Sequence, residues 1–436
     1  MSNSKIASDV ATRRAVRKIF EQSRSDQTDQ LIIEQNTKVH QDKFLVITDT
    51  GSVLHIAKNL LDEGASVIAC ILDPAYKDVY EDIVPKIQNY NIALADGDRI
   101  IIFDSKNIEL AERLRREDYA VIGGGSFSTM DTVNLYSILE SEGLSHPEIS
   151  RYSGSDLLKL ENASFPYSFR STVDGQSYFL KDRGDILENV ARFGEETILN
   201  LRKHVDGPEL KIEAWYDGEK FCSDSVSIFE GHNFLPGDLG VNVDCAYSLT
   251  VPGICDSLFE STLKKLEKHL GYGYAGPVQL TLAISRENKT PYVIEASTDW
   301  LTSGMLSLVN TSLIKFFKSL CEGTLDVQLG HASRAGVRVS IPPYPILTEG
   351  IENIPVRVPE ESFINLSLKL QNDVLCTTGS TGLLGEVFAV DKQPYTAVKK
   401  MHEIAKNIKL SQKQYRSDAC ESALRRLTEI KNMKVL

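Results

Sequence analysis

The stretch AGPVQLTLAISRENKTPYVIEAS, residues 275–297, decides how the centre of this chain folds. Two apolar runs flank the polar segment RENKT, whose composition is typical of a turn. The pattern predicts an antiparallel β-hairpin. Gln279 lies on the first strand, and Glu295 and Ser297 lie at the end of the second. These three side chains all offer oxygen atoms that could bind a metal ion.

The segment before this hairpin predicts more β-structure. ELKIEAWYDGEKF, residues 209–221, alternates apolar and polar residues and contains an Asp-Gly pair, which predicts a second hairpin. Side chains alternate across a strand, so Glu209, Lys211 and Glu213 share one face. That face either contacts a ligand or faces solvent, with Lys211 neutralising its two neighbours.

The first part of the chain has a different pattern. Short β-branched runs within residues 43–52, 65–73, 99–104 and 119–125 are separated by segments of helical periodicity. This alternation predicts a parallel sheet covered by helices on both faces. The first turn, TDTGS, holds one glycine and lacks the GxGxxG fingerprint, which argues against a dinucleotide-dependent oxidoreductase.

A glycine triplet follows the last of these strands, in IGGGSFSTMD at residues 122–131. Glycines let a backbone approach a ligand closely, and a serine can cap the next helix. We therefore expect this turn to bind substrate through Gly123, Gly124, Gly125 and Ser126. The alternative is a tight turn from strand to helix.

Composition limits the class of protein. The chain has 436 residues and a net charge of −12, with 42% hydrophobic and 25% charged residues, as in a globular protein of several domains. The negative charge makes nucleic acid an unlikely binding partner, although it does not exclude nucleic acid as a substrate that the protein modifies. No apolar run approaches the roughly 18 residues of a membrane span. Seven scattered cysteines without a CxxC pair, and the lack of a secretory signal, predict a reduced, cytoplasmic protein.

Four parts of the chain, taken in order, resemble the phosphoribosylamine-glycine ligase (glycinamide ribonucleotide synthetase) family, and more closely its divergent phage versions. GPELKIEAWYDG resembles the family's central strand pair, FLPGDLGVN its GDLGPNTGGMG loop, and residues 271–297 its metal hairpin. GVRVSIPPYP and QYRSDACESAL resemble its C-terminal module. The resemblance implies an α/β chain with a Rossmann-like N-terminal domain, a central ATP-grasp domain and a small α+β C-terminal domain. We expect these at residues 42–145, 146–330 and 331–436, after a polar, solvated extension at residues 1–41.

The resemblance also implies an activity. Enzymes of this family use ATP and Mg²⁺ to convert a carboxylate into an acyl phosphate, which an amine attacks to give an amide. The implied partners are small molecules: an amino acid or another carboxylate, and an amine. Mg²⁺ prefers oxygen ligands, and the pocket must exclude water that would hydrolyse the acyl phosphate.

Site residues follow from the matching positions. The resemblance assigns nucleotide contacts to Lys181, Glu209, Glu213 and Lys203, although Lys181 also fits a surface lysine at a strand end. It assigns catalytic roles to Asp238 and Asn242, in the FLPGDLGVNVD loop, and metal binding to Glu295, Ser297 and Gln279.

The chain departs from the family at several of these positions. The family's Glu-x-Asn metal pair reads Glu295-Ala296-Ser297, Gln279 stands where an acid is common, and Lys203 stands where an adenine-side Glu is common. VDCAY replaces TGGMG, and TDWLTSG replaces RFGDPE. Two hypotheses follow: a ligase with altered substrates, which joins an amino acid to phosphoribosylamine or to a modified nucleotide or DNA base, or a catalytically degenerate scaffold that binds nucleotide or a partner protein.

Overall fold

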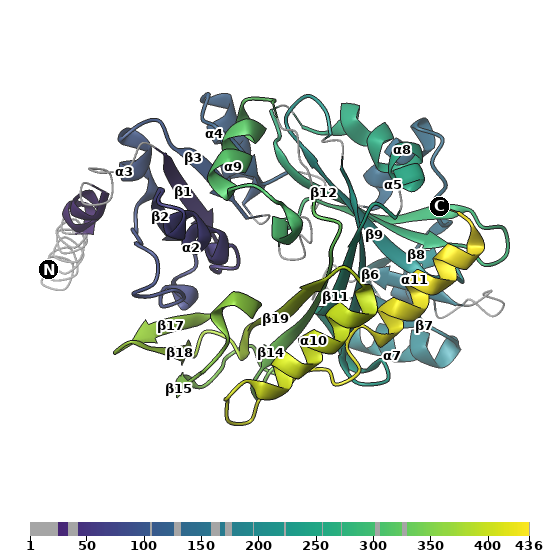
Figure 1. The fold of residues 1–436 in the computed structure, drawn as a ribbon. Coiled ribbons are helices and arrows are strands. Elements are labelled where there is room, and N and C mark those ends of the chain that lie inside the picture. The colour runs from purple at the N-terminus through teal and green to yellow at the C-terminus, as the bar shows by residue number, and fades with distance from the viewer. Residues whose placement is uncertain are drawn as a thin grey trace, which may run out of the picture.

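The computed structural model describes residues 25–33, 42–104, 107–125, 132–157, 166–170, 177–194, 196–221, 224–254, 256–271, 273–300, 306–324 and 329–435. Over these residues the chain forms four β-sheets with surrounding helices (Figure 1). In this part of the chain, no helix is both long and apolar enough to cross a bilayer.

The N-terminal sheet is parallel, as predicted. Its strand order is β2-β1-β3-β4, and its strands are β1 (Lys43–Thr48), β2 (Ser66–Ile71), β3 (Ile100–Phe103) and β4 (Val121–Gly123). The helices that follow these strands are α2 (Leu54–Asp62), α3 (Tyr90–Ala95), α4 (Ile108–Arg116) and α5 (Thr132–Ser141). Separate apolar clusters include alternate residues of β1, because both faces of the sheet are covered.

Part of the expected solvated extension packs onto this sheet. Residues 25–33 form a helix, in which Ile33 is buried in the core beside β1 and β3. The Asp29 carboxylate accepts hydrogen bonds from the backbone N–H groups of Gln88 (3.0 Å) and Asn89 (2.8 Å), just before α3. The expectation of a solvated extension was wrong at Asp29 and Ile33, which are buried.

The largest sheet has eight strands in the order β13-β12-β9-β10-β11-β14-β19-β16, all antiparallel. They are β9 (Glu209–Tyr216), β10 (Val226–Leu235), β11 (Leu239–Pro252), β12 (Gly276–Ile284), β13 (Pro291–Ser297), β14 (Ser333–Ser340), β16 (Phe363–Asn365) and β19 (Leu383–Asp391). The predicted domain boundary at residue 330 therefore falls between strands of one sheet. Beyond it, α10 (Pro394–Asn407) and α11 (Glu421–Met433) cross one face of this sheet (Figure 1).

Two smaller sheets complete the chain. The first has the order β5-β8-β6-β7 and the second β15-β18-β17. Their strands are β5 (Ile149–Ser153), β6 (Tyr167–Arg170), β7 (Ser177–Leu180), β8 (Ile198–Lys203), β15 (Glu352–Pro355), β17 (Leu368–Gln371) and β18 (Val374–Thr378). The remaining helices are α6 (Gly154–Leu157), α7 (Arg183–Phe193), α8 (Asp256–Ser261) and α9 (Leu313–Cys321), with short 3₁₀ turns at Pro74–Tyr76, Leu263–His269, Leu306–Leu308 and Glu360–Ser362.

The two faces of the eight-stranded sheet differ in chemistry. Ala335, Val337 and Val339 of β14 point toward α10, in one apolar cluster with Met401. Strand alternation turns the even-numbered residues of β14 to the opposite face, which lies toward the N-terminal sheet. Charged side chains gather on that opposite face, and they form the candidate site described next.

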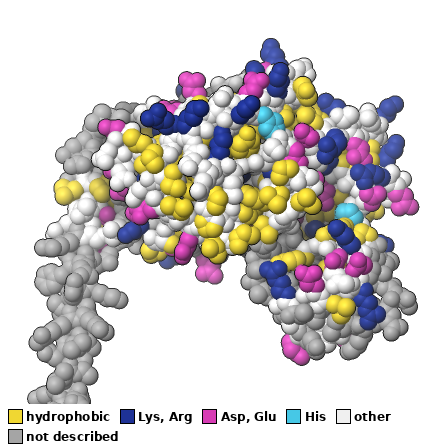
Figure 2. All heavy atoms as spheres, turned by 90° about the horizontal axis from the view of Figure 1, so that it is seen from below, with side chains coloured by type: hydrophobic (Ala, Val, Ile, Leu, Met, Phe, Trp, Pro, Cys, Tyr) yellow, Lys and Arg dark blue, Asp and Glu magenta, His cyan; other side chains and the backbone are white. Residues whose placement is uncertain are grey.

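The outer surface mixes charge types. On the face shown in Figure 2, Lys and Arg side chains are interspersed with Asp and Glu around an area rich in hydrophobic side chains. Large exposed hydrophobic residues of the protein include Ile346, Leu347 and Leu239, which are 75%, 59% and 65% exposed.

Candidate active site

A first row of side chains crosses the β9, β12 and β13 strands. The register places Glu213 opposite Gln279, and Gln279 opposite Ser297. Residues directly opposite in antiparallel strands point to the same face. Gln279 Nε2 donates to Glu213 Oε2 at 2.9 Å, and Trp215 Nε1 lies 3.4 Å from Glu213 Oε1. Glu213 is fully buried, so the interpretation of this face as plain solvent was wrong at this position.

A second row lies beside the first and contains Lys211, Thr281 and Glu295. The Nζ of Lys211 lies 2.6 Å from the carboxylate of Glu230 on β10, whose side chain is 2% exposed. Burial opposes the charge of Lys211, but the charges of Glu230 and Glu295 outweigh burial and raise the pKa of this lysine above its ordinary value. The second row therefore holds a permanent ammonium close to the predicted metal carboxylate.

The charged face continues through β11 to β14 and β19. Glu230 is opposite Ser248, and Ser248 is opposite Gly336, which lies between Arg334 and Arg338 on β14. Directly opposed residues point to the same face of a sheet, so Glu230, Ser248 and Gly336 share one face. Arg334 and Arg338, two residues on either side of Gly336, point to that face too, which is also the face of the two rows. The sheet thus carries a band of alternating charge from β13 toward β19.

Arg334, Glu386 and Arg338 form a buried cluster at the far end of this band. Glu386 of β19 contacts Arg334 at 2.5 Å and Arg338 at 3.1 Å, and all three side chains are less than a tenth exposed. Burial favours the protonated form of Glu386, but the two arginines overcome it and hold its pKa below the ordinary value. We call these three residues the Arg–Glu–Arg cluster.

His55, in the first turn of α2, lies beside the Arg–Glu–Arg cluster. Its Nδ1 lies 3.1 Å from the carbonyl oxygen of Ser52, so Nδ1 carries the proton and donates. Burial, with a smaller contribution from the arginines, lowers the pKa of His55 to about 4. The ring is therefore neutral at pH 7.

The loop before α2 is held by a single buried carboxylate. Asp104, at the end of β3, accepts hydrogen bonds from the Thr48 hydroxyl, the Asp49 N–H at 3.1 Å and the Ser52 hydroxyl at 3.4 Å. These bonds fix the loop that precedes His55, and so fix the edge of the N-terminal sheet that faces the charged band.

The neutral state of His55 makes stability depend on pH. In the unfolded chain this ring takes up a proton near its ordinary pKa of about 6.5, whereas the folded chain resists protonation until about pH 4. His55 therefore contributes stability that is present above pH 6.5 and is lost as the pH falls toward 4. When the pH is lowered from 7 to 5, the free energy of unfolding of His55→Gln is expected to fall by roughly 1–2 kcal/mol less than that of the unmodified protein. Urea denaturation at the two pH values measures both changes.

The matched control for this prediction is His331→Gln, because His331 is exposed and precedes β14. It should lose as much stability between pH 7 and pH 5 as the unmodified protein. An identical loss in His55→Gln would show that His55 does not resist protonation in the folded chain.

The structure places the predicted catalytic loop at the tip of the β10–β11 hairpin. Asp238 adopts a positive φ of 57° and is about half exposed, and its carboxylate lies 2.9 Å from Arg416 Nη1. Asp418 accepts the Gly237 N–H at 2.8 Å, and Arg416 is itself buried. Asn242 lies further along β11, opposite Asn233. These contacts tie the turn to the C-terminal segment, and the catalytic roles of Asp238 and Asn242 stay predictions.

Lys181 and Lys203 are exposed at the ends of β7 and β8 in the small sheet. Next to Lys203, Arg202 donates through Nη1 to the carbonyl oxygen of Ile294 at 3.0 Å, one residue before Glu295. Arg202 therefore connects the small sheet to the β12–β13 hairpin, a role that the sequence alone did not suggest. Glu209 lies at the start of β9 and is partly buried, opposite Ala283.

The glycine triplet lies where β4 meets the start of β12. The Gly123 N–H donates to the carbonyl oxygen of Ala275 at 2.7 Å, and a Cβ on Gly125 would lie 2.5 Å from the Tyr274 ring. The glycines are thus required by close packing of the protein against itself. Their role toward a substrate stays a prediction, and Ser126 lies outside the described residues.

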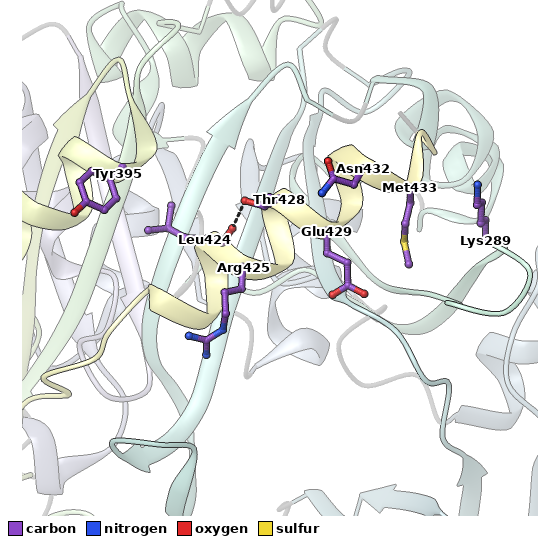
Figure 3. A pocket seen from close by; sticks show the side chains of 8 residues that line it. All are labelled: Lys289, Tyr395, Leu424, Arg425, Thr428, Glu429, Asn432 and Met433. Atoms are coloured by element: carbon purple, nitrogen blue, oxygen red, sulfur yellow. Dashed lines mark hydrogen bonds between the residues drawn. The ribbon is translucent and has the colours of Figure 1, made fainter.

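A groove also follows α11, on the helix-covered side of the large sheet (Figure 3). Here Thr428 donates to the Leu424 carbonyl oxygen at 2.8 Å, a bond within the helix. The groove lies across the sheet from the two rows, so it is separate from the candidate site. Its lining residues are Lys289, Tyr395, Leu424, Arg425, Thr428, Glu429, Asn432 and Met433.

The predicted metal residues offer a limited set of ligands. In the part of the chain that the structure describes, no three His, Cys, Asp or Glu side chains gather as a metal cluster. Glu295 supplies one carboxylate, while Gln279 and Ser297 supply a neutral amide and a hydroxyl. Mg²⁺ is commonly held by one or two carboxylates together with substrate phosphates. The residues therefore fit one Mg²⁺ that arrives with a nucleotide.

No protein-family model and no curated protein matches the chain. Solved structures do match. Phosphoribosylamine-glycine ligase from Thermotoga maritima is 18% identical, with 86% of this chain and 99% of that chain covered and a TM-score of 0.67. The biotin carboxylase domain of 2-oxoglutarate carboxylase from Hydrogenobacter thermophilus, solved with MgADP and bicarbonate, is 10% identical. The match covers 89% of this chain and 99% of that chain, with a TM-score of 0.63.

L-amino acid ligase from Bacillus licheniformis is 13% identical, over 85% of this chain and 98% of that chain, with a TM-score of 0.58. At these identities the likeness shows the fold. The chain has the ATP-grasp fold, which confirms the architecture that the sequence resemblance implied.

Proposed function

We propose that this chain is an ATP-dependent ligase that joins a carboxylate to an amine through an acyl phosphate. The observation that carries the proposal is the pair of oppositely charged groups on the second row, the Glu295 carboxylate and the Lys211 ammonium, which lie on either side of Thr281. A carboxylate can hold the cation of MgATP, and a buried ammonium can face its phosphates. The shared fold with two proteins named as ligases supports the same conclusion.

The proposed reaction has two steps. A carboxylate oxygen of the substrate attacks the γ-phosphorus of ATP, and ADP leaves. The amine nitrogen then attacks the acyl carbon, phosphate leaves, and the nitrogen loses a proton as the C–N bond forms. A bound Mg²⁺ would neutralise phosphate charge in such a site.

Each part of the chain has a proposed role in these steps. Glu295, with Gln279 and Ser297 as neutral ligands, would hold the Mg²⁺ of MgATP. Lys211 places its charge beside that carboxylate. Lys181 and Lys203, exposed on the small sheet, would contact the nucleotide from the other side, and Glu209 and Glu213 would line its pocket.

The substrate end is proposed to differ from that of phosphoribosylamine-glycine ligase. Asp238, Asn242 and the glycine turn from Gly123 would surround the acid and the amine. Because TGGMG and RFGDPE are replaced in this chain, we propose an amino acid as the acid, with phosphoribosylamine, a modified nucleotide or a DNA base as the amine. The reaction would take place in the cytoplasm, and in the host cytoplasm for a phage-encoded protein.

Calorimetric titration with ATP, with and without Mg²⁺, tests the proposal. We expect binding below 1 mM that depends on Mg²⁺, because the site has one carboxylate and needs phosphates to complete the ion's shell. A phosphate-release screen over pairs of amino acids and amines would then identify substrates. If ATP at millimolar concentration does not bind, with or without Mg²⁺, the ligase proposal fails.

One observation favours a second function, a scaffold that binds nucleotide without catalysis. The Gln279 amide nitrogen donates to Glu213 in the first row, where relatives commonly place a metal-binding acid. Such a protein would bind ATP yet release no phosphate with any substrate pair. Detection of an amide product above background excludes it.

A further inference from the structure

The first row has little capacity for a second divalent ion. Both carboxylate oxygens of Glu213 face donors of the protein, Gln279 and Trp215, and Glu213 is fully buried. Ser297 Oγ accepts the Asp299 N–H at 3.1 Å. A second Mg²⁺ would need further anionic oxygen ligands in near-octahedral positions, and Glu213, the carboxylate of the first row, already accepts the protein's own hydrogen bonds.

The second row already contains a positive charge. Lys211 lies two strands from Glu295, with only Thr281 between them in the register. The Nζ of Lys211 contacts Glu230 on β10, the strand on the other side of β9 from the hairpin. The ammonium therefore lies over the central strands β9 and β10, while Glu295 lies two strand spacings of about 4.8 Å each from β9.

Lys211 is held in place and yet accessible. Its Nζ contacts Glu230 at 2.6 Å, Glu230 is 2% exposed, and the lysine side chain remains 17% exposed. A buried carboxylate on a central strand has few alternative positions, so it anchors the ammonium. Lysine acts on phosphate as a compact point charge, without the planar geometry that arginine requires.

We propose that the Lys211 ammonium supplies the positive charge that a second Mg²⁺ would bring to the nucleotide, so that the site binds one divalent ion per nucleotide. The inference rests on the proposed function, because it presupposes that ATP binds at Glu295. It assigns to Lys211 a nucleotide-binding role in which a fixed charge of the chain replaces a metal ion.

Mn²⁺ binding, followed by electron paramagnetic resonance in the presence of a saturating non-hydrolysable ATP analogue, tests the inference. The unmodified full chain is expected to bind one Mn²⁺. Lys211→Met is expected to weaken analogue binding by about 10-fold or more, the usual effect of losing a charge-assisted contact, while the Mn²⁺ count does not rise. Lys211→Arg should retain most of the affinity, and Lys211→Glu should gain a second Mn²⁺.

Two further variants keep the experiment decisive. The double variant Lys211→Met with Glu230→Gln removes both charges, so it avoids a stranded buried carboxylate if Lys211→Met alone fails to fold. Lys264→Met is the matched control, because Lys264 is half exposed and pairs with Glu260 one helical turn away. It should bind the analogue and Mn²⁺ as the unmodified chain does.

The outcomes separate this inference from the proposed function. Two Mn²⁺ ions on the unmodified chain, or unchanged analogue affinity in Lys211→Met and in the double variant, would overturn the role of Lys211 and leave the ligase proposal standing. Failure of the unmodified chain to bind the analogue would overturn both.

Discussion

Replacement of Glu295 by glutamine is expected to reduce ATP turnover by about 10²-fold to 10³-fold while the fold remains intact. Glutamine keeps the shape of the side chain and removes its charge. Glu295 is the one carboxylate among the three candidate metal ligands, so the neutral variant retains only amide and hydroxyl ligands. The measurement is phosphate release at saturating ATP and Mg²⁺, once the screen has identified a substrate pair.

A matched surface variant separates this effect from general damage. Glu260→Gln alters an exposed acid on α8 that pairs with Lys264, and it should leave turnover and melting temperature unchanged. Both variants should unfold at temperatures close to that of the unmodified protein. If Glu295→Gln turned over ATP at the normal rate, Glu295 would not hold the catalytic ion, and the candidate site would lie elsewhere.

Local sequence patterns were sufficient for the parallel sheet and for the β12–β13 hairpin. The apolar runs of residues 43–48 and 99–104 became paired strands β1 and β3, because a strand buried on both faces has a recognisable composition. The register next to the turn pairs Leu282 with Val293, and a bulge between Thr281 and Leu282 then brings Glu295 opposite Thr281, a shift that the sequence did not predict. The ATP-grasp fold came from the resemblance, and the solved structures confirm it, whereas the division into domains stays a prediction.

The Arg–Glu–Arg cluster could not be predicted from sequence. Alternation along SRAGVRVS places Arg334 and Arg338 on one face, but it does not show that Glu386 lies opposite Arg338. That contact depends on the pairing of β14 with β19, which is a long-range register. For the same reason, the sequence showed Lys211 only beside Glu209 and Glu213, and the structure adds Glu230 from β10 as its partner.

Burial of the first row also depends on distant parts of the chain. Glu213 appeared on a face that could have been solvent, because strand alternation says nothing about what covers a face. In the fold, Trp215 of the same strand packs edge to face against Trp300, with ring centroids 5.2 Å apart, and both belong to a core cluster that includes α2 and α9. The N-terminal domain therefore covers this part of the sheet.

Replacement of Glu386 by glutamine is expected to lower the free energy of unfolding by about 3–5 kcal/mol at pH 7. The variant leaves Arg334 and Arg338 buried without their compensating charge, and stranding a buried charge costs more than the ion pair itself contributes. The measurement is urea denaturation, followed by circular dichroism. Glu352→Gln is the control, because Glu352 is more than half exposed and pairs with Lys369, and it should have little effect.

The same variant makes a prediction about acid, because the two arginines hold the pKa of Glu386 below its unfolded value. The stability that Glu386 contributes is therefore complete above an unfolded pKa of about 4.3, and it is lost as the pH falls through the lower pKa of the folded state. The difference in stability between the unmodified protein and Glu386→Gln should shrink below about pH 4. A difference that stays constant down to pH 3 would mean that Glu386 acts through packing, because a charge contribution must disappear when the carboxylate is protonated in both states.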